Sequence, residues 1–449
     1  ASRFFDSAQY QVMRPGHLSV GNNGNCLKSF LYAYVLANIT MQNKLILFLI
    51  IGLIFSVRIS ADPSGWTNDK LVVSNNQSYT LQNPQTTMDF KGNLHMMWQD
   101  NRNYPNYDLF YKKLDNNGNN LTADIFISSA SQWGSMHRIV SDKFGMIHIV
   151  FIGANTQYNE LFYKKLNNEG KNLTGDISLS NAFAWWPNFA VDSKRNVYVV
   201  WKNKNGIGYK KLDSHGKNLT PELQITYDSS DGIGSIVLDG KNNVHLGWHR
   251  TIGPYNNQEI YYQKFDENLT ALTNEIRLTQ HSTSNSYSTT QPPILFLDKR
   301  ENVHIAWQDL VQYVGPSLPN FEIIYSKLNN NGTQIINKTQ ISNNKEISQN
   351  PSMVVDACGF VRVAWQQETI LGKGEDEIYY AELNSDGKNI TEEIRLTNAS
   401  KESEIPSLTV DRNGRSHIVW QDNRNGTYSS YNWEVYYKRS LSSIRKEVC

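Results

Sequence analysis

Cysteine is scarce in this chain, with three residues in 449. Cys26, Cys358 and Cys449 do not make a disulfide framework; a Cys358–Cys449 pair in an oxidising compartment and unpaired thiols both stay open. A long helical period is missing too, whereas Tyr (24) and Trp (11) are frequent, so the composition predicts an all-β protein. The net charge of +1 provides no overall field for binding nucleic acid.

Motifs for several common chemistries are missing as well. The chain has no serine-nucleophile motif, no phosphate-binding loop and no Cys/His spacing suited to a metal. It also has no basic stripe interleaved with aromatic residues. The sequence therefore predicts no cofactor, no metal site and no nucleic-acid partner.

What the chain has instead is one ten-residue pattern that occurs seven times. Each copy begins with Asp, passes through a polar turn, and ends in an apolar run whose aromatic residue lies nine positions after the Asp. The copies are Asp89–Trp98, Asp142–Phe151, Asp192–Trp201, Asp239–Trp248, Asp298–Trp307, Asp356–Trp365 and Asp411–Trp420. An Asp before a Gly/Asn-rich turn and a β-branched run is typical of a hairpin, and a period of about 50 residues indicates a propeller, solenoid or array.

Each repeat predicts four strands. The first ends at the Asp, the second ends at the aromatic residue, the third is Tyr-rich as in Glu259–Phe265, and the fourth resembles Glu275–Thr279. The seventh repeat stops after its third strand, at Ser440, while a solitary strand, Lys70–Ser74, precedes the first repeat. If that strand completes the last repeat, the ring closes without an open sheet edge. We therefore predict an all-β fold, a seven-bladed β-propeller of four-stranded antiparallel blades closed by Lys70–Ser74.

Three regions are expected along the chain. Residues 1–40 read as an irregular upstream extension. Residues 41–61 contain a short basic start and the apolar run Leu45–Val57, which is typical of a signal peptide and short for a membrane span, which needs about 20 residues. An uncleaved anchor is the alternative and would be the chain's one link to a membrane. Residues 62–449 form the propeller, which we expect to be extracellular or at the cell surface.

The strand order predicts two faces with different chemistry. One carries the Asp turns and most of the N-x-[ST] sequons, and we expect glycosylation there if the signal peptide directs secretion. The alternative is that N-L-T simply suits a turn. The expected acceptors are Asn120, Asn172, Asn268, Asn331, Asn337 and Asn389.

The opposite face carries the segments that differ between repeats, including the long loops Leu310–Phe321 and Glu368–Asp376 and the links between blades. Rigid scaffolds use such loops to bind ligands, and aromatic rings beside Arg and Asn suit sugars or extended peptides. The alternative is that the aromatic residues plug the central channel. The candidate ligand-binding residues are Trp133, His137, Arg138, Trp185, Trp186, Tyr287, Arg102 and Arg424.

Residues repeated in every blade are assigned to the fold, because a catalytic site needs one copy of its groups. The seven Asp residues are therefore expected to cap turns. Five His residues share one position, but they lie in different blades and cannot converge on one metal ion, so we expect hydrogen bonds between blades. These are His95, His148, His245, His304 and His417. Trp98–Asn103 and Trp420–Asn425 are nearly identical; their Gln and Asp are expected to hold loops, with a polar rim as the alternative.

With its V-D-x-x-G-N-V-H-V-V-W-Q-D repeat, the chain resembles the sialidase-like (BNR, Asp-box-related) secreted β-propeller proteins across residues 62–449. The superfamily's turn motif, S-x-D-x-G-x-x-W, is echoed with a longer spacing, as in Asp411–Trp420. The resemblance implies a propeller, and in true sialidases six blades, an arginine triad and a Tyr–Glu pair. Only Arg138, in H-R-I-V, is a loose match to the first arginine motif, so the resemblance carries over no catalytic residue.

Three functions compete on this evidence. The first is a non-enzymatic binding or adhesion module for glycans or cell-surface partners, which the missing catalytic set favours. The second is a structural cell-coat glycoprotein that assembles with copies of itself. The third is a sialidase-like glycoside hydrolase, which needs a carboxylate pair at the channel mouth; Asp100, Asp309, Asp422 and Glu368 qualify by position. The sequence favours them in that order and leans away from an enzyme.

Overall fold

The computed structural model describes residues 63–74, 81–103, 107–130, 136–153, 159–180, 183–253, 257–281, 292–314, 318–343, 346–356, 359–368, 376–426 and 432–441. The expected extension, the signal peptide, the three cysteines, Trp133 and Tyr287 lie outside these residues. Among the described residues, no helix is long and apolar enough to cross a membrane.

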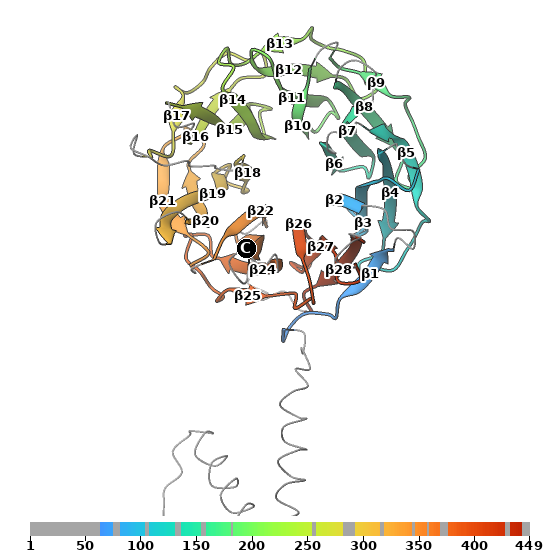
Figure 1. Ribbon diagram of the computed structural model, residues 1–449. Coiled ribbons are helices and arrows are strands. Elements are labelled where there is room, and N and C mark those ends of the chain that lie inside the picture. The colour runs from blue at the N-terminus through green and yellow to red at the C-terminus, as the bar shows by residue number, and fades with distance from the viewer. Residues whose placement is uncertain are drawn as a thin grey trace, which may run out of the picture. The chain divides into compact units, whose positions relative to one another are not determined.

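The described chain forms a seven-bladed β-propeller, as predicted (Figure 1). Each blade is a four-stranded antiparallel sheet whose first strand lies innermost. Blade 1 holds β2 (Leu81–Met88), β3 (Leu94–Asp100), β4 (Tyr107–Leu114) and β5 (Ile125–Ala130). Blade 2 holds β6 (His137–Ser141), β7 (Ile147–Gly153), β8 (Glu160–Leu166) and β9 (Ile177–Ser178). Blade 3 holds β10 (Trp185–Val191), β11 (Val197–Asn203), β12 (Gly206–Leu212) and β13 (Leu223–Gln224).

The remaining blades follow the same order around the ring. Blade 4 holds β14 (Asp231–Leu238), β15 (Val244–Ile252), β16 (Asn257–Phe265) and β17 (Ile276–Arg277). Blade 5 holds β18 (Ile294–Leu297), β19 (Val303–Val314), β20 (Leu318–Leu328) and β21 (Gln334–Gln340). Blade 6 holds β22 (Ser348–Val355), β23 (Val361–Glu368), β24 (Asp376–Leu383) and β25 (Ile394–Arg395). Blade 7 holds β26 (Ser403–Val410), β27 (Ser416–Asp422), β28 (Glu434–Arg439) and β1 (Lys70–Val73).

Strand β1 closes the ring by pairing antiparallel with β28, Lys70 opposite Tyr437. Val72 and Val73 are buried between blades. The buried Lys438 bridges Leu396 O (2.6 Å) and Asp69 (2.8 Å), and Lys112 of blade 1 donates to Val72 O (2.8 Å). Inside the ring, Lys164 makes the same contact with Ile127 O of the preceding blade (2.6 Å). The seam therefore repeats the bonds of the other blade junctions, and β1 substitutes for a fourth strand, as predicted.

The second strand of each blade is buried on both faces, because a blade is covered by two neighbours. All seven residues of β3, β7 and β27 are buried. The repeated aromatic residue stacks on its cross-strand partner, as in Trp98–Phe110, Trp248–Tyr261 and Trp420–Tyr436, with ring centroids 5.8–6.0 Å apart. Such pairs account for the aromatic residue in five blades. In blades 3 and 5, Trp201 and Trp307 lie opposite Gly208 and Ile324 and pack in the hydrophobic core.

The repeated Asp residues cap their turns, as predicted. Oδ1 of Asp89 accepts hydrogen bonds from the backbone N–H groups of Lys91 and Asn93, both at 2.8 Å. Its Oδ2 contacts Nε2 of His95 at 3.2 Å, and Nδ1 of His95 contacts the Tyr111 hydroxyl at 2.6 Å. The expectation that these His residues bond between blades was wrong, since both partners lie in the same blade. The reason is the register, which places the third-strand Tyr diagonally beside the His.

Burial of these histidines makes stability depend on pH. Burial lowers the pKa of His245 and His304 to about 4 and lowers those of His95, His148 and His417. The unfolded chain, with His pKa values near 6.5, then binds more protons than the folded chain between about pH 4 and 6.5, so stability falls as the pH drops through this window. The raised pKa values of Glu404, Asp376, Glu377 and His281 act in the opposite direction. Burial also lowers the pKa of His137 to about 3 and that of His249 to about 4, which adds two groups to the five.

We therefore expect the melting temperature to be lower at pH 4.5 than at pH 7.5, measured by thermal melts across this range. His304→Gln should flatten the dependence in part, whereas His215→Gln, at an exposed turn, should leave it unchanged. A melting temperature that is constant from pH 7.5 to 4.5 would contradict the prediction.

Candidate functional site

The face built from the blade links and from the loops between second and third strands, here called the loop face, surrounds a central channel. The channel is a hollow of about 580 Å³ lined by the seven innermost strands. Strand register places one residue of each blade at the same depth, because each pairs with the residue just before the repeated aromatic. This set, here called the channel ring, comprises Gln85, Arg138, Asn188, Ser235, Ile294, Ser352 and Ser407.

At the loop face, four inner strands carry a bulge before the channel ring. Asn83, Trp186, Asn350 and Ile405 have φ values of +46 to +53°, each is followed by Pro, and the register shifts at each site. Asn adopts this left-handed backbone at little cost, whereas Trp and Ile do so rarely. Strain of this kind persists where the surrounding structure enforces it, and it clusters at functional sites.

Two carboxylic acids lie beside these bulges at the junction of blades 6 and 7. Glu404 is the second residue of β26 and directly precedes the channel-lining Ile405, and Asp376 begins β24. Burial, with the negative charges of Asp376 and Glu402, raises the pKa of Glu404 to about 7. Burial, with Glu368 and Glu402, also raises the pKa of Asp376. A carboxyl group that is half protonated at neutral pH beside a second carboxylate is the arrangement that acid–base catalysis requires.

Two glutamines position these acids. Gln421 donates from Nε2 to Glu404 (3.0 Å), and its Oε1 accepts the N–H of Asn83 (3.0 Å). Gln366 donates from Nε2 to Asp376, and its Oε1 accepts from Asn350 Nδ2 (2.9 Å) and Ile405 N (3.3 Å). Each Gln follows the repeated Trp. The prediction that this Gln and the next Asp hold a loop is confirmed for the Asp, since Asp422 accepts the N–H of Arg424 (2.9 Å). The two Gln residues instead bond the bulged strands and the acids.

Aromatic side chains gather at blades 3 and 4 instead. Trp186 lines the channel with 43% of its surface exposed, and it meets His249 edge-on at 6.3 Å. Trp185 stacks on Phe183 at 5.4 Å, and Tyr227 in the next blade link is 82% exposed. Because the Trp186 side chain is exposed to the channel, it does not fill the channel as a buried core residue.

The remaining predicted ligand residues lie in different environments. Arg138 lies in the channel ring, whereas His137 is 1% exposed and burial lowers its pKa to about 3. Arg102 pairs with Asp100 and Asp124, and Arg424 with Asp422 and Asp69. Both arginine charges are thus already neutralised within the fold, and a ligand-binding role for them stays a prediction.

Three of the carboxylates proposed from position alone also have partners within the fold. Asp100 and Asp422 accept from the adjacent Trp indoles and from the arginines, and Asp309 pairs with His281 (2.6 Å) and Lys338 (3.2 Å). Glu368 lies next to Asp376 across β23 and β24. Leu310–Phe321, expected as a loop, is mostly strand, since β19 extends to Val314 and β20 begins at Leu318. Its alternating sequence V-Q-Y-V suits a strand.

Glu404 and Asp376 were missed because no motif contains them, yet a signal was present. Glu404 occupies the position held by Gln82, Trp185 and Gln349 in other blades. A single carboxylate in a position otherwise neutral breaks the symmetry of the repeat, and comparison of the repeats could have found it.

The sequon asparagines are all exposed on the face of the Asp turns. The Thr of N-L-T, and of N-I-T at Asn389, has a structural role there: the backbone N–H groups of Lys113, Lys165 and Glu382 donate to the hydroxyls of Thr122, Thr174 and Thr391 at 2.9–3.0 Å. The turn interpretation therefore explains the recurrence of N-L-T, and glycosylation stays a prediction.

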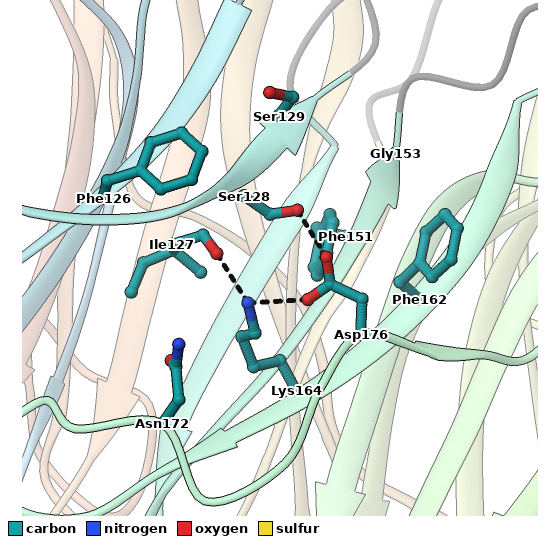
Figure 2. A pocket seen from close by; sticks show the side chains of 10 residues that line it. All are labelled: Phe126, Ile127, Ser128, Ser129, Phe151, Gly153, Phe162, Lys164, Asn172 and Asp176. Carbon is teal, nitrogen blue, oxygen red and sulfur yellow. Dashed lines mark hydrogen bonds and ion pairs between the residues drawn. The ribbon is translucent and has the colours of Figure 1, made fainter.

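A second hollow, of about 500 Å³, lies at the outer rim between β5 of blade 1 and blade 2 (Figure 2). Its polar groups satisfy one another: Lys164 bonds Asp176 (2.7 Å) and Ile127 O (2.6 Å), and Ser128 donates to Asp176 (2.7 Å). The same Lys–Asp pair recurs as Lys112–Asp124 and Lys438–Asp69. This hollow therefore belongs to the blade junction. Among the described residues, no group of three His, Cys, Asp or Glu side chains could hold a metal ion.

Comparisons with known proteins identify solved structures with a similar fold but assign the chain to no protein family. No protein-family model matches the chain, and no curated protein matches its sequence. An ulvan lyase of polysaccharide lyase family PL25, bound to -[GlcA(1-4)Rha3S]-, is 9% identical, with 83% of this chain and 98% of that chain covered and a TM-score of 0.55. The α-L-arabinofuranosidase Arb93a from Fusarium graminearum is 11% identical (84% and 98% covered, TM-score 0.50). A protein of unknown function from Dyadobacter fermentans is 12% identical (84% and 99% covered, TM-score 0.51).

This chain shares its fold with β-propeller glycoside hydrolases and lyases rather than with sialidases in particular. The expectation of a non-enzymatic binding module, and the leaning against an enzyme, were wrong: two of the three named similar structures are carbohydrate-cleaving enzymes. The expectation rested on the absence of a catalytic motif, and a sequence motif does not report side chains that only folding brings together.

Proposed function

We propose that this chain is a glycan-processing enzyme, a glycoside hydrolase or polysaccharide lyase, that works at the loop-face mouth of the channel. The observation that carries the proposal is the pair of acids with raised pKa, Glu404 and Asp376. The fold likeness to an ulvan lyase and an arabinofuranosidase supports it. A sialidase-like hydrolase is the finer form of the proposal, supported by the resemblance of the repeats.

The two acids suit complementary roles. Glu404, protonated in part at neutral pH, would donate a proton to the glycosidic oxygen as the C–O bond breaks. Asp376, in its carboxylate form, would activate water or stabilise the developing positive charge at the sugar. In a lyase, the carboxylate form of one acid would take the proton from the carbon beside a uronate carboxylate. The C–O bond to the leaving sugar would break as the C=C bond forms, and the protonated acid would donate its proton to the departing oxygen. Both schemes place the substrate between the acids and the aromatic residues of blades 3 and 4.

The test is turnover by the full propeller on neutral, acidic and sulfated polysaccharides, aryl glycosides and sialosides. New reducing ends without an unsaturated product would indicate a hydrolase, and ultraviolet absorbance of an unsaturated product would indicate a lyase. No turnover on any of these, by protein with a cooperative thermal melt, would refute the proposal. We further propose that the enzyme is secreted or cell-surface, with a glycan as its partner.

Trp186 provides a prediction about substrate binding. Trp186→Ala should raise KM for an oligosaccharide about 3- to 10-fold, since an aromatic contact contributes roughly 0.5–1.5 kcal/mol, and should leave the melting temperature nearly unchanged because the ring is exposed. Phe144→Ala, which removes an exposed ring (51%) from an Asp turn on the opposite face, is the control. An unchanged KM would show that Trp186 does not touch the substrate.

A further inference from the structure

Arg138 is the one charged side chain among the described residues that line the channel. The rest of the channel ring is Gln, Asn, Ser or Ile. Since the ring positions are equivalent by register, an arginine in a single blade has no role in the repeat itself. It therefore breaks the symmetry at the centre of the molecule.

Three of the other polar ring residues hold neighbouring blades together. Asn188 donates to Gly234 O of blade 4 (2.8 Å), Ser352 accepts from Leu408 N of blade 7 (3.0 Å), and Ser407 accepts from Thr86 N of blade 1 (3.0 Å). Arg138 makes no such bridge among the described residues. Its Nη1 donates to the carbonyl of the preceding residue, His137, at 2.9 Å.

Arg138 also differs from the other arginines of the loop face. Arg102, Arg250 and Arg424 each pair with at least two carboxylates. Within the described part of the chain, no carboxylate pairs with Arg138, and burial lowers the pKa of its guanidinium. A partly buried cation without a counter-charge is costly, and its fork of N–H donors matches carboxylate and sulfate groups.

We propose that Arg138 is the anion-binding residue of the channel, and that the glycan entering the channel mouth carries carboxylate or sulfate groups. The proposal rests on the proposed function in one respect: the anion is taken to be part of a glycan. Asn188, at the next position of the channel ring in blade 3, and the exposed Trp186 would contact the uncharged part of the same sugar.

The experiment measures binding rather than turnover. Oligoglucuronate supplies carboxylates, sulfated galactan oligosaccharides supply sulfates, and cellotetraose supplies neither. Titration calorimetry at low salt should show binding of at least one acidic probe to the wild type, weakened about 10- to 100-fold in Arg138→Met, because a charged hydrogen bond contributes roughly 1.5–3 kcal/mol. Arg138→Lys should lie between. Whichever acidic probe binds identifies the group.

Two control variants separate the ring position from net charge. Arg412→Met and Arg300→Met each remove an exposed arginine at an Asp turn on the opposite face, with the same change in net charge as Arg138→Met; both should bind like the wild type. Equal affinity for cellotetraose and the acidic probes, no binding of either acidic probe, or unchanged binding by Arg138→Met would each overturn the inference.

The experiments distinguish a failure of this inference from a failure of the proposed function. Acidic probes bound through Arg138 without turnover of any glycan would refute the enzyme and keep the anion site. Turnover of neutral glycans alone, unaffected by Arg138→Met, would keep the enzyme and refute the anion site.

Discussion

Deletion of Asp69–Ser74 should lower the melting temperature by more than about 10 °C. The deletion leaves the edge of β28 unpaired and removes two buried valines, Val72 and Val73, each contributing roughly 1.5–3 kcal/mol. It also removes Asp69, the partner of the fully buried Lys438, and losing one partner of a buried pair costs about 3–5 kcal/mol. Scanning calorimetry on the full chain measures the effect.

Point variants in the same strand supply a matched control. Val73→Asp buries a charge and should destabilise strongly, whereas Leu71→Asp, at a position 42% exposed, should cost little. Equal, small effects of Val73→Asp and the deletion would show that the ring is not held by β1.

Glu404→Gln should reduce kcat about 100- to 10,000-fold, the usual contribution of a general acid. Gln retains an oxygen that can accept from Gln421 but has no proton of suitable acidity to transfer. Because the pKa of Glu404 is raised to about 7, wild-type activity should decline as the pH rises above 7, and this alkaline limb should disappear in the residual activity of the variant.

The control for Glu404→Gln is Glu392→Gln, at an exposed position near the Asp turns, which should keep wild-type kcat and pH profile. If the glycan is cleaved by the wild type and Glu404→Gln retains full kcat, the proton comes from another group. The proposal that the protein is an enzyme would then be kept, but the assignment of Glu404 as its general acid would be wrong.

The fold was predictable because its determinants are local and repeated. Each repeated Asp caps its own turn, as Asp89 does by accepting from Lys91 and Asn93. The same ten-residue pattern therefore recurs in each blade. The missing fourth strand of the last repeat and the surplus Lys70–Ser74 then fixed the closure. The partners of His95 were less predictable, since the spacing of Asp, His and Tyr is the same whether they meet within a blade or between blades.

The site could be predicted only in part, because its chemistry depends on burial and on neighbours distant in the sequence. Arg138 and Trp186 were found as departures from the repeat. Glu404 has an unusual pKa only because folding buries it beside Asp376 and Glu402, and no spacing in the sequence reports that proximity.

The pairing of β1 with β28 has a consequence for how the protein is made. The segment synthesised first among the blades must wait for the segment synthesised last. Until the ribosome has released β28, the nascent ring exposes an unpaired strand edge at each end, a template for aggregation. Such long-range closure is slow, so premature termination within blade 7 should produce chains that chaperones retain, even though six blades are complete.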